Sequence, residues 1–66
     1  MSKYSFAENL KMYREERDMT QKELAAVLRV SPSTVSSWET SSKYPTIDRL
    51  YDIARVLGVS VTMLIK

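Results

Sequence analysis

Apolar residues recur at helical spacing in several short segments of the chain. Phe6, Leu10 and Tyr13 lie three or four residues apart, and Leu24 and Leu28 repeat the spacing further on. This period marks one face of an α-helix, and no segment alternates cleanly between apolar and polar residues as a half-buried strand would. The pattern therefore predicts an all-α fold, a compact five-helix bundle. The expected helices cover residues 6–17, 21–28, 32–40, 47–57 and 61–65.

Polar residues that can cap a helix precede the first two segments. Ser5 with Glu8, and Thr20 with Glu23, have the spacing of a capping box. In that motif each side chain bonds the free backbone N–H of the other residue. Both pairs therefore predict the start of a helix.

The other three segments have equally clear ends. Ser31 can cap the third helix with Pro32 at its first position, where the missing N–H of proline costs nothing. Thr46 and Ser60 can cap the fourth and fifth helices in the same way. Gly58 is the expected stop of the fourth helix, because glycine readily adopts the left-handed conformation found there.

Two helices are expected to supply much of the core. Val35 and Trp38 have the spacing of an inward face on the third helix. Trp38 could instead stack on a nucleic-acid base, but a single tryptophan at this spacing is more typical of a core. On the fourth helix, the residues expected to share the inward side are Ile47, Leu50, Tyr51, Ala54 and Leu57.

The 66 residues are enough for one domain, taken as residues 1–66, with a single small core. The chain has no Cys and no His, the residues that most often act as nucleophile, general base or metal ligand. It also has no glycine-rich phosphate loop and no paired carboxylates in a plausible pocket. From the sequence we therefore expect no enzyme activity, no metal and no cofactor.

The charge of the chain is weakly basic, since ten Lys and Arg against eight Asp and Glu give +2. This balance is consistent with a nucleic-acid partner if the basic groups gather on one face. The first residues contain no apolar signal segment, and no apolar run approaches the ~18 residues that span a bilayer. We therefore expect a cytoplasmic protein with no membrane partner.

The second and third helices are separated by only three or four residues, and the break carries one apolar residue, Val30. A break this short prevents the two helices from running antiparallel, so they must cross steeply. That is the geometry of a helix-turn-helix unit. A purely structural corner between two helices remains the alternative at this point.

The third helix has an unusual composition, because eight of the residues from 31 to 42 are Ser or Thr. Their side chains compete for backbone hydrogen bonds, so they are mediocre helix formers. A surface selected only for stability would carry Ala, Glu, Lys or Gln instead. Small hydroxyl side chains let a helix approach a partner closely, while the alternative is a solvated surface without a role.

The spacing of these features across four helices resembles the phage-repressor/Cro family of DNA-binding proteins, also called XRE-like. The resemblance spans about residues 6 to 65 and implies a five-helix domain that binds operator DNA. It also implies a two-fold dimer, at least on DNA, that reads a palindromic operator with the third helix in the major groove. The residues that carry the resemblance are Arg14, Arg17, Thr20, Gln21, Leu24, Ala25, Val30, Ser31, Val35, Trp38, Glu39, Pro45 and the positions Ile53, Ala54, Leu57, Gly58, Val59 and Ser60.

Carried over by position, the resemblance implies two sets of DNA contacts. The positions that read base edges in double-stranded DNA are Pro32, Ser33, Thr34 and Ser37. Pro32 has no donor and offers only apolar contact, for instance with a thymine methyl group. The positions that contact phosphates are Thr20, Gln21, Thr40, Ser42, Lys43 and Thr46.

Two further groups of residues are implied to act in the structure and in the assembly. Arg14 and Glu39 match a pair that joins the first helix to the end of the third, and such a pair at a surface would be worth little. Val61, Met63 and Ile65 lie in a short segment that is more apolar than a chain end requires. Either this segment only closes the core, or its bare face meets a two-fold mate, since repressor-like domains pair there.

Three positions depart from the pattern of the family. Arg29 stands where the family usually has a glycine, so a left-handed backbone there would be strained by roughly 1 kcal/mol. Thr40 and Ser41 replace the usual polar-glycine pair, which predicts an altered loop. Residues 31–37 contain no Arg, Lys, Gln or Asn, so base reading is expected to depend more on DNA shape and phosphates.

The sequence therefore favours a sequence-specific transcriptional regulator, a repressor or Cro-like switch of phage or bacterial type. The alternative is a protein-interaction module on the same fold, such as an antitoxin-like partner or an antagonist of another regulator. Its support is the third helix, which lacks the side chains that bind guanine best.

Overall fold

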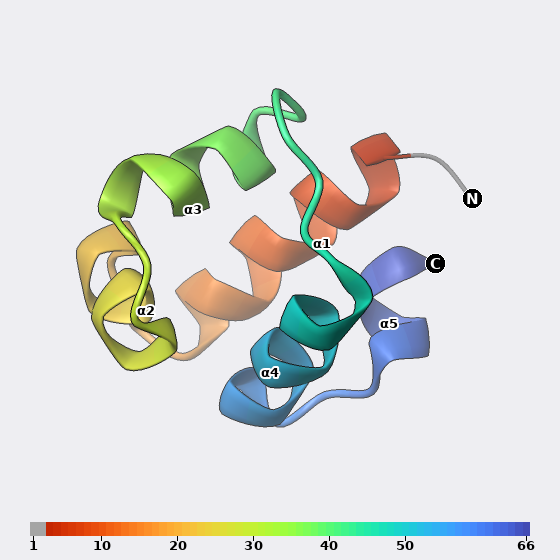
Figure 1. Ribbon diagram of the computed structural model, residues 1–66. Coiled ribbons are helices and arrows are strands. Elements are labelled where there is room, and N and C mark those ends of the chain that lie inside the picture. Colours follow the sequence, from red (N-terminus) through yellow and green to blue (C-terminus); the bar gives the residue numbers. More distant parts are fainter. Residues whose placement is uncertain (1–2) are drawn as a thin grey trace.

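The computed structural model describes residues 3–66, with side chains from Phe6 onward. Within this range the chain forms five α-helices and no strand, which confirms the all-α fold class. In Figure 1, α1 runs through the middle of the bundle, with α2 and α3 on one side of it and α4 and α5 on the other. The bounds are α1 Lys3–Glu16, α2 Gln21–Leu28, α3 Pro32–Glu39, α4 Ile47–Leu57 and α5 Val61–Ile65.

The start of α1 differs from the expectation. The helix begins at Lys3, so Ser5 lies inside it and the capping box expected at Ser5 and Glu8 was wrong. The helix therefore begins about one turn before Phe6, the residue at which the apolar pattern starts. An apolar pattern reports only the part of a helix that packs, and not its full length.

The other four helix starts agree with the sequence. Thr20 accepts from the backbone N–H of Glu23 at 3.0 Å, and Glu23 Oε1 accepts from the N–H of Thr20 at 2.8 Å. This is the expected capping box of α2. The other three helices are each capped by a single hydroxyl, which accepts from the backbone N–H three residues further along the chain. These caps are Ser31, Thr46 and Ser60.

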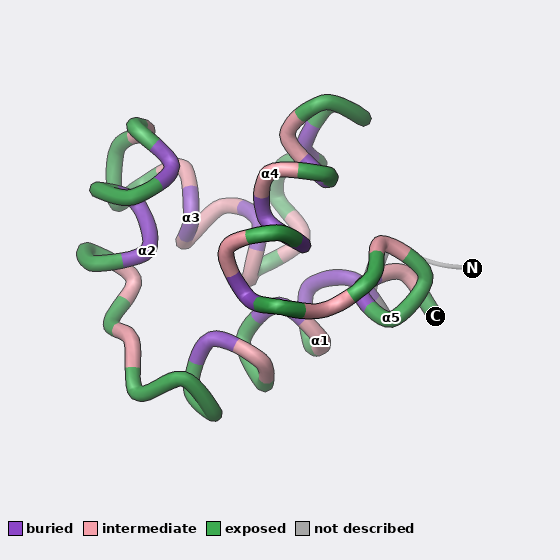
Figure 2. The backbone as a smooth tube through the Cα atoms, turned by 90° about the horizontal axis from the view of Figure 1, so that it is seen from below, coloured by how far each residue is buried: buried purple, intermediate pink, exposed green. Residues whose placement is uncertain are grey.

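The core is formed by one face of every helix. In Figure 2 each helix carries both buried and exposed stretches, as expected for amphipathic elements in a single bundle. Val35 and Trp38 of α3 are 0% and 4% exposed, so both lie in the core as their spacing indicated. The fully buried large side chains are Phe6, Leu10, Leu24, Val35, Ile53, Leu57 and Leu64.

The buried face of α4 differs from the expected one. Ile47 and Tyr51 are 69% and 59% exposed, and Ile53 is buried in their place. The predicted inward face included two residues that lie on the flank of the helix. Apolar residues at i, i+3 and i+4 define the centre of the buried stripe, but the sequence does not show how wide the stripe is. The residues of α4 that pack inward are Leu50, Ile53, Ala54 and Leu57.

Within the part of the chain that the structure describes, three non-glycine residues adopt a left-handed backbone: Asp18, Arg29 and Ser41. Arg29 has φ of 61° directly after α2, and Ser41 has φ of 63° in the loop after α3. Both are positions where the sequence departs from the family's glycine. A side chain at each position is therefore held in a left-handed backbone, which costs strain.

Residues 3–66 contain neither a membrane-spanning helix nor a cluster of metal ligands. No helix there is both long enough and apolar enough to cross a membrane. In the same residues, no three His, Cys, Asp or Glu side chains are grouped so that they could hold a metal ion.

Candidate nucleic-acid interface

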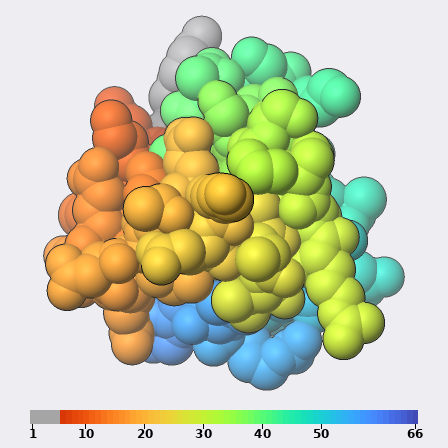
Figure 3. Space-filling view, turned by 90° about the vertical axis from the view of Figure 1, so that its left-hand side faces the viewer, coloured from red at the N-terminus to blue at the C-terminus, as the bar shows by residue number. Residues whose placement is uncertain are grey.

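The turn between α2 and α3 fixes how the two helices cross. The N–H of Arg29 bonds the carbonyl of Ala26 at 3.2 Å, and the N–H of Val30 bonds the carbonyl of Ala25 at 3.0 Å. These bonds close the end of α2, and Val30 packs against the core. The space-filling view in Figure 3 shows α2 and α3 as neighbours on one face of the molecule. The two helices therefore form a helix-turn-helix unit with α3 at the surface.

The residues expected to read base edges lie on the outer side of α3. Pro32 and Ser33 are exposed, and Thr34 and Ser37 are half-buried. The inner side of the same helix is held by Val35 and Trp38 in the core. The structure thus brings the four expected residues together on one helix, with their hydroxyl or apolar ends near solvent.

The hydroxyl groups on α3 differ in how far they are already satisfied. Ser31 Oγ lies 3.0 Å from Ser33 Oγ and 2.8 Å from Thr34 Oγ1, so these three hydroxyls bond one another. Thr40 Oγ1 bonds the carbonyl of Ser36 at 3.0 Å. Among the described residues, the Ser37 hydroxyl has no hydrogen-bond partner. Ser37 is therefore the base-reading candidate whose hydroxyl is most available to a partner.

A buried ion pair joins α1 to the end of α3. Arg14 Nε donates to Glu39 Oε2 at 2.6 Å, and Nη2 donates to Oε1 at 3.0 Å, a bidentate contact. The side chains of Arg14 and Glu39 are only 9% and 3% exposed. Hydrogen bonding to Glu39 is the main reason that the pKa of Arg14 is raised, so the guanidinium stays charged. The expectation of a weak surface pair was therefore wrong, since the two charges are out of water.

The same carboxylate also binds a residue expected to contact phosphate. Gln21 Nε2 donates to Glu39 Oε1 at 3.0 Å. Because each amide nitrogen carries two hydrogens, Gln21 keeps one N–H for another partner. The link joins α2 to α3 through Glu39, so a single carboxylate connects three helices.

The remaining phosphate candidates lie at helix ends and in the loop after α3. Thr20 and Thr46 are the N-caps of α2 and α4, where free backbone N–H groups favour an anion. Thr40, Ser42 and Lys43 follow α3 directly, and Ser42 and Lys43 are exposed. Thr40 Oγ1 lies 3.0 Å from Ser42 Oγ, which orders this part of the loop.

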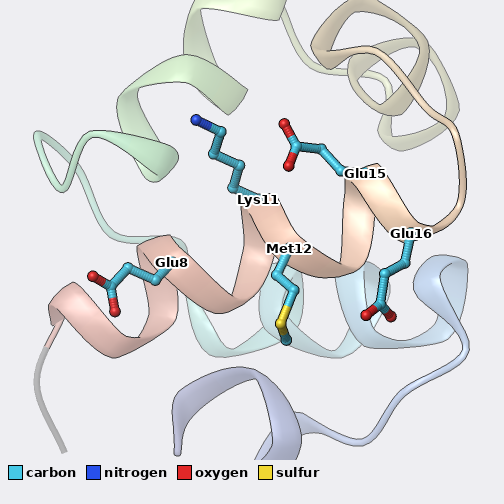
Figure 4. Close-up of a pocket in the computed structure, with 5 residues that line it drawn as sticks. All are labelled: Glu8, Lys11, Met12, Glu15 and Glu16. Atoms are coloured by element: carbon cyan, nitrogen blue, oxygen red, sulfur yellow. The ribbon is translucent and has the colours of Figure 1, made fainter.

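The outer face of α1 has the opposite character. An open hollow of about 460 Å³ lies there, lined by residues of that one helix, whose side chains are drawn in Figure 4. Three of its five lining residues are Glu8, Glu15 and Glu16, against the single cation Lys11. This acidic face is unsuited to a nucleic-acid backbone, so a DNA contact is favoured on the side of α2 and α3.

The residues expected at a dimer contact are not equally available. Met63 is 44% exposed, whereas Val61 and Ile65 are half-buried and pack against the core. Val61 also lines a hollow of about 510 Å³ that includes Tyr51 of α4. Tyr51 was not expected at this surface, because its spacing had placed it inside.

Sequence reasoning also missed several polar contacts that position the helices. Asn9 Nδ2 donates to the carbonyls of Met63, Leu64 and Lys66 at 3.2, 2.8 and 3.1 Å, which fixes α5 against α1. Arg49 Nη1 donates to the carbonyl of Leu28 at 2.9 Å and so joins α4 to the end of α2. The partners are far apart along the chain, so no local sequence signal could have found them.

The fold and the surface of α3 define a small helix-turn-helix domain. A family model described as helix-turn-helix matches residues 10–64. This is more than half of the chain, so the chain belongs to that family, and the resemblance to the XRE-like group is confirmed.

Curated relatives are similar over nearly the whole chain. The HTH-type transcriptional activator BcrR of Enterococcus faecalis is 33% identical over 92% of this chain and 30% of its own length. The uncharacterized HTH-type transcriptional regulator YqaE of Bacillus subtilis is also 33% identical, over 92% of this chain and 53% of its own length. A third, y4dJ of Sinorhizobium fredii, is 38% identical over 79% of this chain and 68% of its own length. The chain thus spans about a third to a half of the first two relatives.

Solved structures extend the likeness to an enzyme. Hydroxypropylphosphonic acid epoxidase from S. wedmorenis matches 98% of this chain with a TM-score of 0.91 and 38% identity, over 35% of its own chain. An iron(II) form of HppE matches with the same TM-score and 37% identity, covering all of this chain and 35% of its own. This finding corrects the expectation that the missing His and Cys place the chain outside enzymes. A domain of this fold therefore also occurs within an enzyme chain.

Proposed function

We propose that this domain is a sequence-specific, double-stranded DNA-binding module of a transcriptional regulator. The observation that carries the proposal is the outer side of α3, whose Ser and Thr residues face solvent while Val35 and Trp38 hold the helix from behind. Such a helix can enter the major groove without displacing part of its own core. The names of the curated relatives, all HTH-type transcriptional regulators, support the same class.

The proposed base contacts come from Pro32, Ser33, Thr34 and Ser37. The Ser37 hydroxyl has no hydrogen-bond partner among the described residues and Pro32 is exposed, so we assign to these two the main part of direct base reading. Residues 31–42 contain no Lys or Arg, and their one charged side chain is that of Glu39. Its charge is balanced by Arg14, so the reading surface does not repel DNA.

Phosphate contacts are proposed at both ends of this surface. Thr20 and Gln21 serve at the start of α2, and Thr40, Ser42, Lys43 and Thr46 serve in the loop after α3 and at the start of α4. Lys43 is the one cation of this set, so it contributes most to the dependence of binding on salt.

The proposed assembly on DNA is a two-fold dimer on a palindromic operator. Val61, Met63 and Ile65 remain the candidate contacts, and we add the exposed Tyr51, which lines the same hollow as Val61. Two copies would place their α3 helices in successive major grooves, about 34 Å apart. Regulation would then follow from occupation of the operator, as in a repressor or Cro-like switch.

Selection of bound sequences from a random duplex library tests the proposal. A symmetric motif is the expected result, with affinity that falls steeply as salt is raised. Sedimentation with and without the selected duplex then measures the assembly, and Tyr51→Glu should weaken pairing without unfolding the chain. Failure to enrich any sequence would reject the DNA-reading role and favour a protein-interaction module on the same fold.

A further inference from the structure

Gln21 lies at the first position of α2 and has a side chain that is half-buried. Its Nε2 donates to Glu39 Oε1 at 3.0 Å. The carboxylate of Glu39 can only accept hydrogen bonds while it is ionised, so the nitrogen of the amide, and not its oxygen, must face Glu39. The orientation of the Gln21 amide is therefore fixed before any ligand arrives.

Glu39 is in turn held rigidly by α1. Its two oxygens accept from Nε and Nη2 of Arg14 at 2.6 and 3.0 Å. Arg14 Nη1 also donates to the carbonyl of Met19 at 2.6 Å, directly before the start of α2. Glu39 thus has no freedom to turn away from Gln21, and the fixed geometry extends from α1 through α3 to α2.

The remaining N–H of the Gln21 amide has no partner among the described residues. It belongs to the same helix end at which Thr20 caps one backbone N–H, while the first N–H groups of α2 stay free. An oriented side-chain donor beside free backbone donors suits an anionic oxygen of a DNA phosphate.

We propose that Glu39 is a positioning residue, which presets the Gln21 amide so that its second N–H is directed to a DNA phosphate. This inference rests on the proposed function and adds to it the residue that orients the phosphate contact. Arg14 completes the device by cancelling the charge of Glu39, which would otherwise lie close to the bound phosphate. The binding of DNA therefore does not have to order this side chain, which lowers the entropic cost of the contact.

The first experiment measures the free protein by NMR. The chain contains one Gln and one Asn, so only two side-chain NH₂ groups of this kind give signals. Asn9, which donates to two carbonyls of α5 and to that of Lys66, is the internal reference for an immobilised amide. We expect the order parameter of the Gln21 NH₂ group to be high, near the rigid value of about 0.85, whereas a value below about 0.6 would overturn the proposal.

The second experiment removes Glu39 without leaving a buried charge. The double variant Arg14→Met/Glu39→Met replaces the pair with apolar side chains of similar size, a change that is often neutral for stability. In this background we expect the Gln21 amide to become mobile while the Asn9 amide stays rigid. If Gln21 stays rigid there, Glu39 is not what positions it and the proposal fails.

The third experiment measures binding to the duplex selected from the random library. Gln21→Met should weaken binding about tenfold in the parent chain, as expected for a lost hydrogen bond to a charged group. In the Arg14→Met/Glu39→Met background the same change should cost less than about threefold, because the amide is no longer preset. Lys22→Met, at an exposed neighbour without a link to Glu39, is the matched control and should cost the same in both backgrounds.

The outcomes distinguish a failure of the positioning role of Glu39 from a failure of the proposed DNA binding. If Gln21→Met costs the same in both backgrounds while Ser37→Ala alters site preference, the domain reads DNA but Glu39 does not position Gln21. If no duplex is bound by the parent chain, the proposed function fails, and the phosphate role of Gln21 fails with it. If the double variant does not fold, the order parameter of Gln21 in the parent chain still decides whether the amide is preset.

Discussion

Helices α3 and α4 are built on different principles. α4 is an amphipathic helix of 11 residues with four buried apolar residues, a Thr46 cap and a Gly58 end. α3 has eight residues, of which only Val35 and Trp38 are buried, and its other positions are mostly Ser or Thr. α4 therefore gains much of its stability from its own pattern, whereas α3 depends on contacts that other helices provide.

The difference indicates what each helix is for. Ser and Thr lower the intrinsic stability of α3, since their hydroxyls compete for backbone hydrogen bonds. The fold compensates with two large inward side chains and with the buried pair of Arg14 and Glu39. A helix that is held mainly from behind leaves its outer side available to a partner, and this is the arrangement that the proposed DNA contact needs.

The ends of α2 and α4 extend the same comparison. Both helices end in a left-handed residue, Arg29 with φ of 61° and Gly58 with φ of 70°. Glycine adopts this conformation without strain, but arginine does not. At Gly58 a Cβ would meet only the guanidinium of Arg17, the movable end of a flexible side chain, so this end favours glycine mainly for its left-handed conformation.

The largest effect is expected from the core anchor of α3. Trp38→Ala should lower the free energy of unfolding by about 3–5 kcal/mol, because it removes a large buried side chain from a helix with only two. A chain of this length has about 3–10 kcal/mol in total, so most of its stability would be lost. Urea denaturation followed by circular dichroism measures the change. Leu57→Ala in α4 is the comparison, and a smaller loss for Trp38→Ala than for Leu57→Ala would contradict the dependence of α3 on its anchor.

The next effect is expected from the buried ion pair. Arg14→Ala should cost about 3 kcal/mol, because it leaves the carboxylate of Glu39 buried without its main partner. The double variant Arg14→Met/Glu39→Met should recover most of that loss, since no charge then remains unpaired. Thermal and urea unfolding of both variants provide the test. An unchanged midpoint for Arg14→Ala would mean that the pair does not hold α3.

A smaller effect of the opposite sign is expected at the turn before α3. Arg29→Gly should raise the free energy of unfolding by about 1 kcal/mol, since it relieves the left-handed strain. Arg29→Ala removes the same charge but keeps the Cβ, so it should show no such gain. Equal stabilities for the two variants, compared by urea unfolding, would show that the turn is not strained.

The smallest effect on stability is expected on the reading face itself. Ser37→Ala should stabilise the domain by about 0.5 kcal/mol, because alanine is the better helix former. It should also change the preference among DNA sites, whereas Ser36→Ala should bring a similar gain without changing it. Competition binding with the selected duplex and its single-base variants measures the preference. Identical preferences for both variants would remove Ser37 from the reading face.

Local signals in the sequence located four of the five expected helix starts, and only the start expected at Ser5 was wrong. The caps at Thr20, Ser31 and Ser60 depend on contacts within three residues, and all were found. The surface of α4 could not be assigned in the same way. Whether Tyr51 lies inside or outside depends on the angle at which α4 meets the bundle, and the stripe of apolar residues does not define that angle.

The position of the candidate residues on the outer side of α3 could be predicted, but their contacts with other helices could not. The hydroxyl composition of α3 pointed to an outer face with Ser33 and Ser37, and both lie toward solvent. The burial of Glu39 and its bond to Gln21 depend on three helices that meet at one point, and no spacing along the chain reports such a meeting.

The sequence by itself therefore determined the helices, the caps of α2 to α5 and the polar side of α3, because each follows from the period of apolar residues and from hydrogen bonds within one turn. The tertiary structure alone decided which charges are buried, which apolar residues of α4 remain exposed and which side chain orients Gln21. These depend on side chains that are distant in the chain and are brought together by packing, and their energies depend strongly on the water that packing excludes.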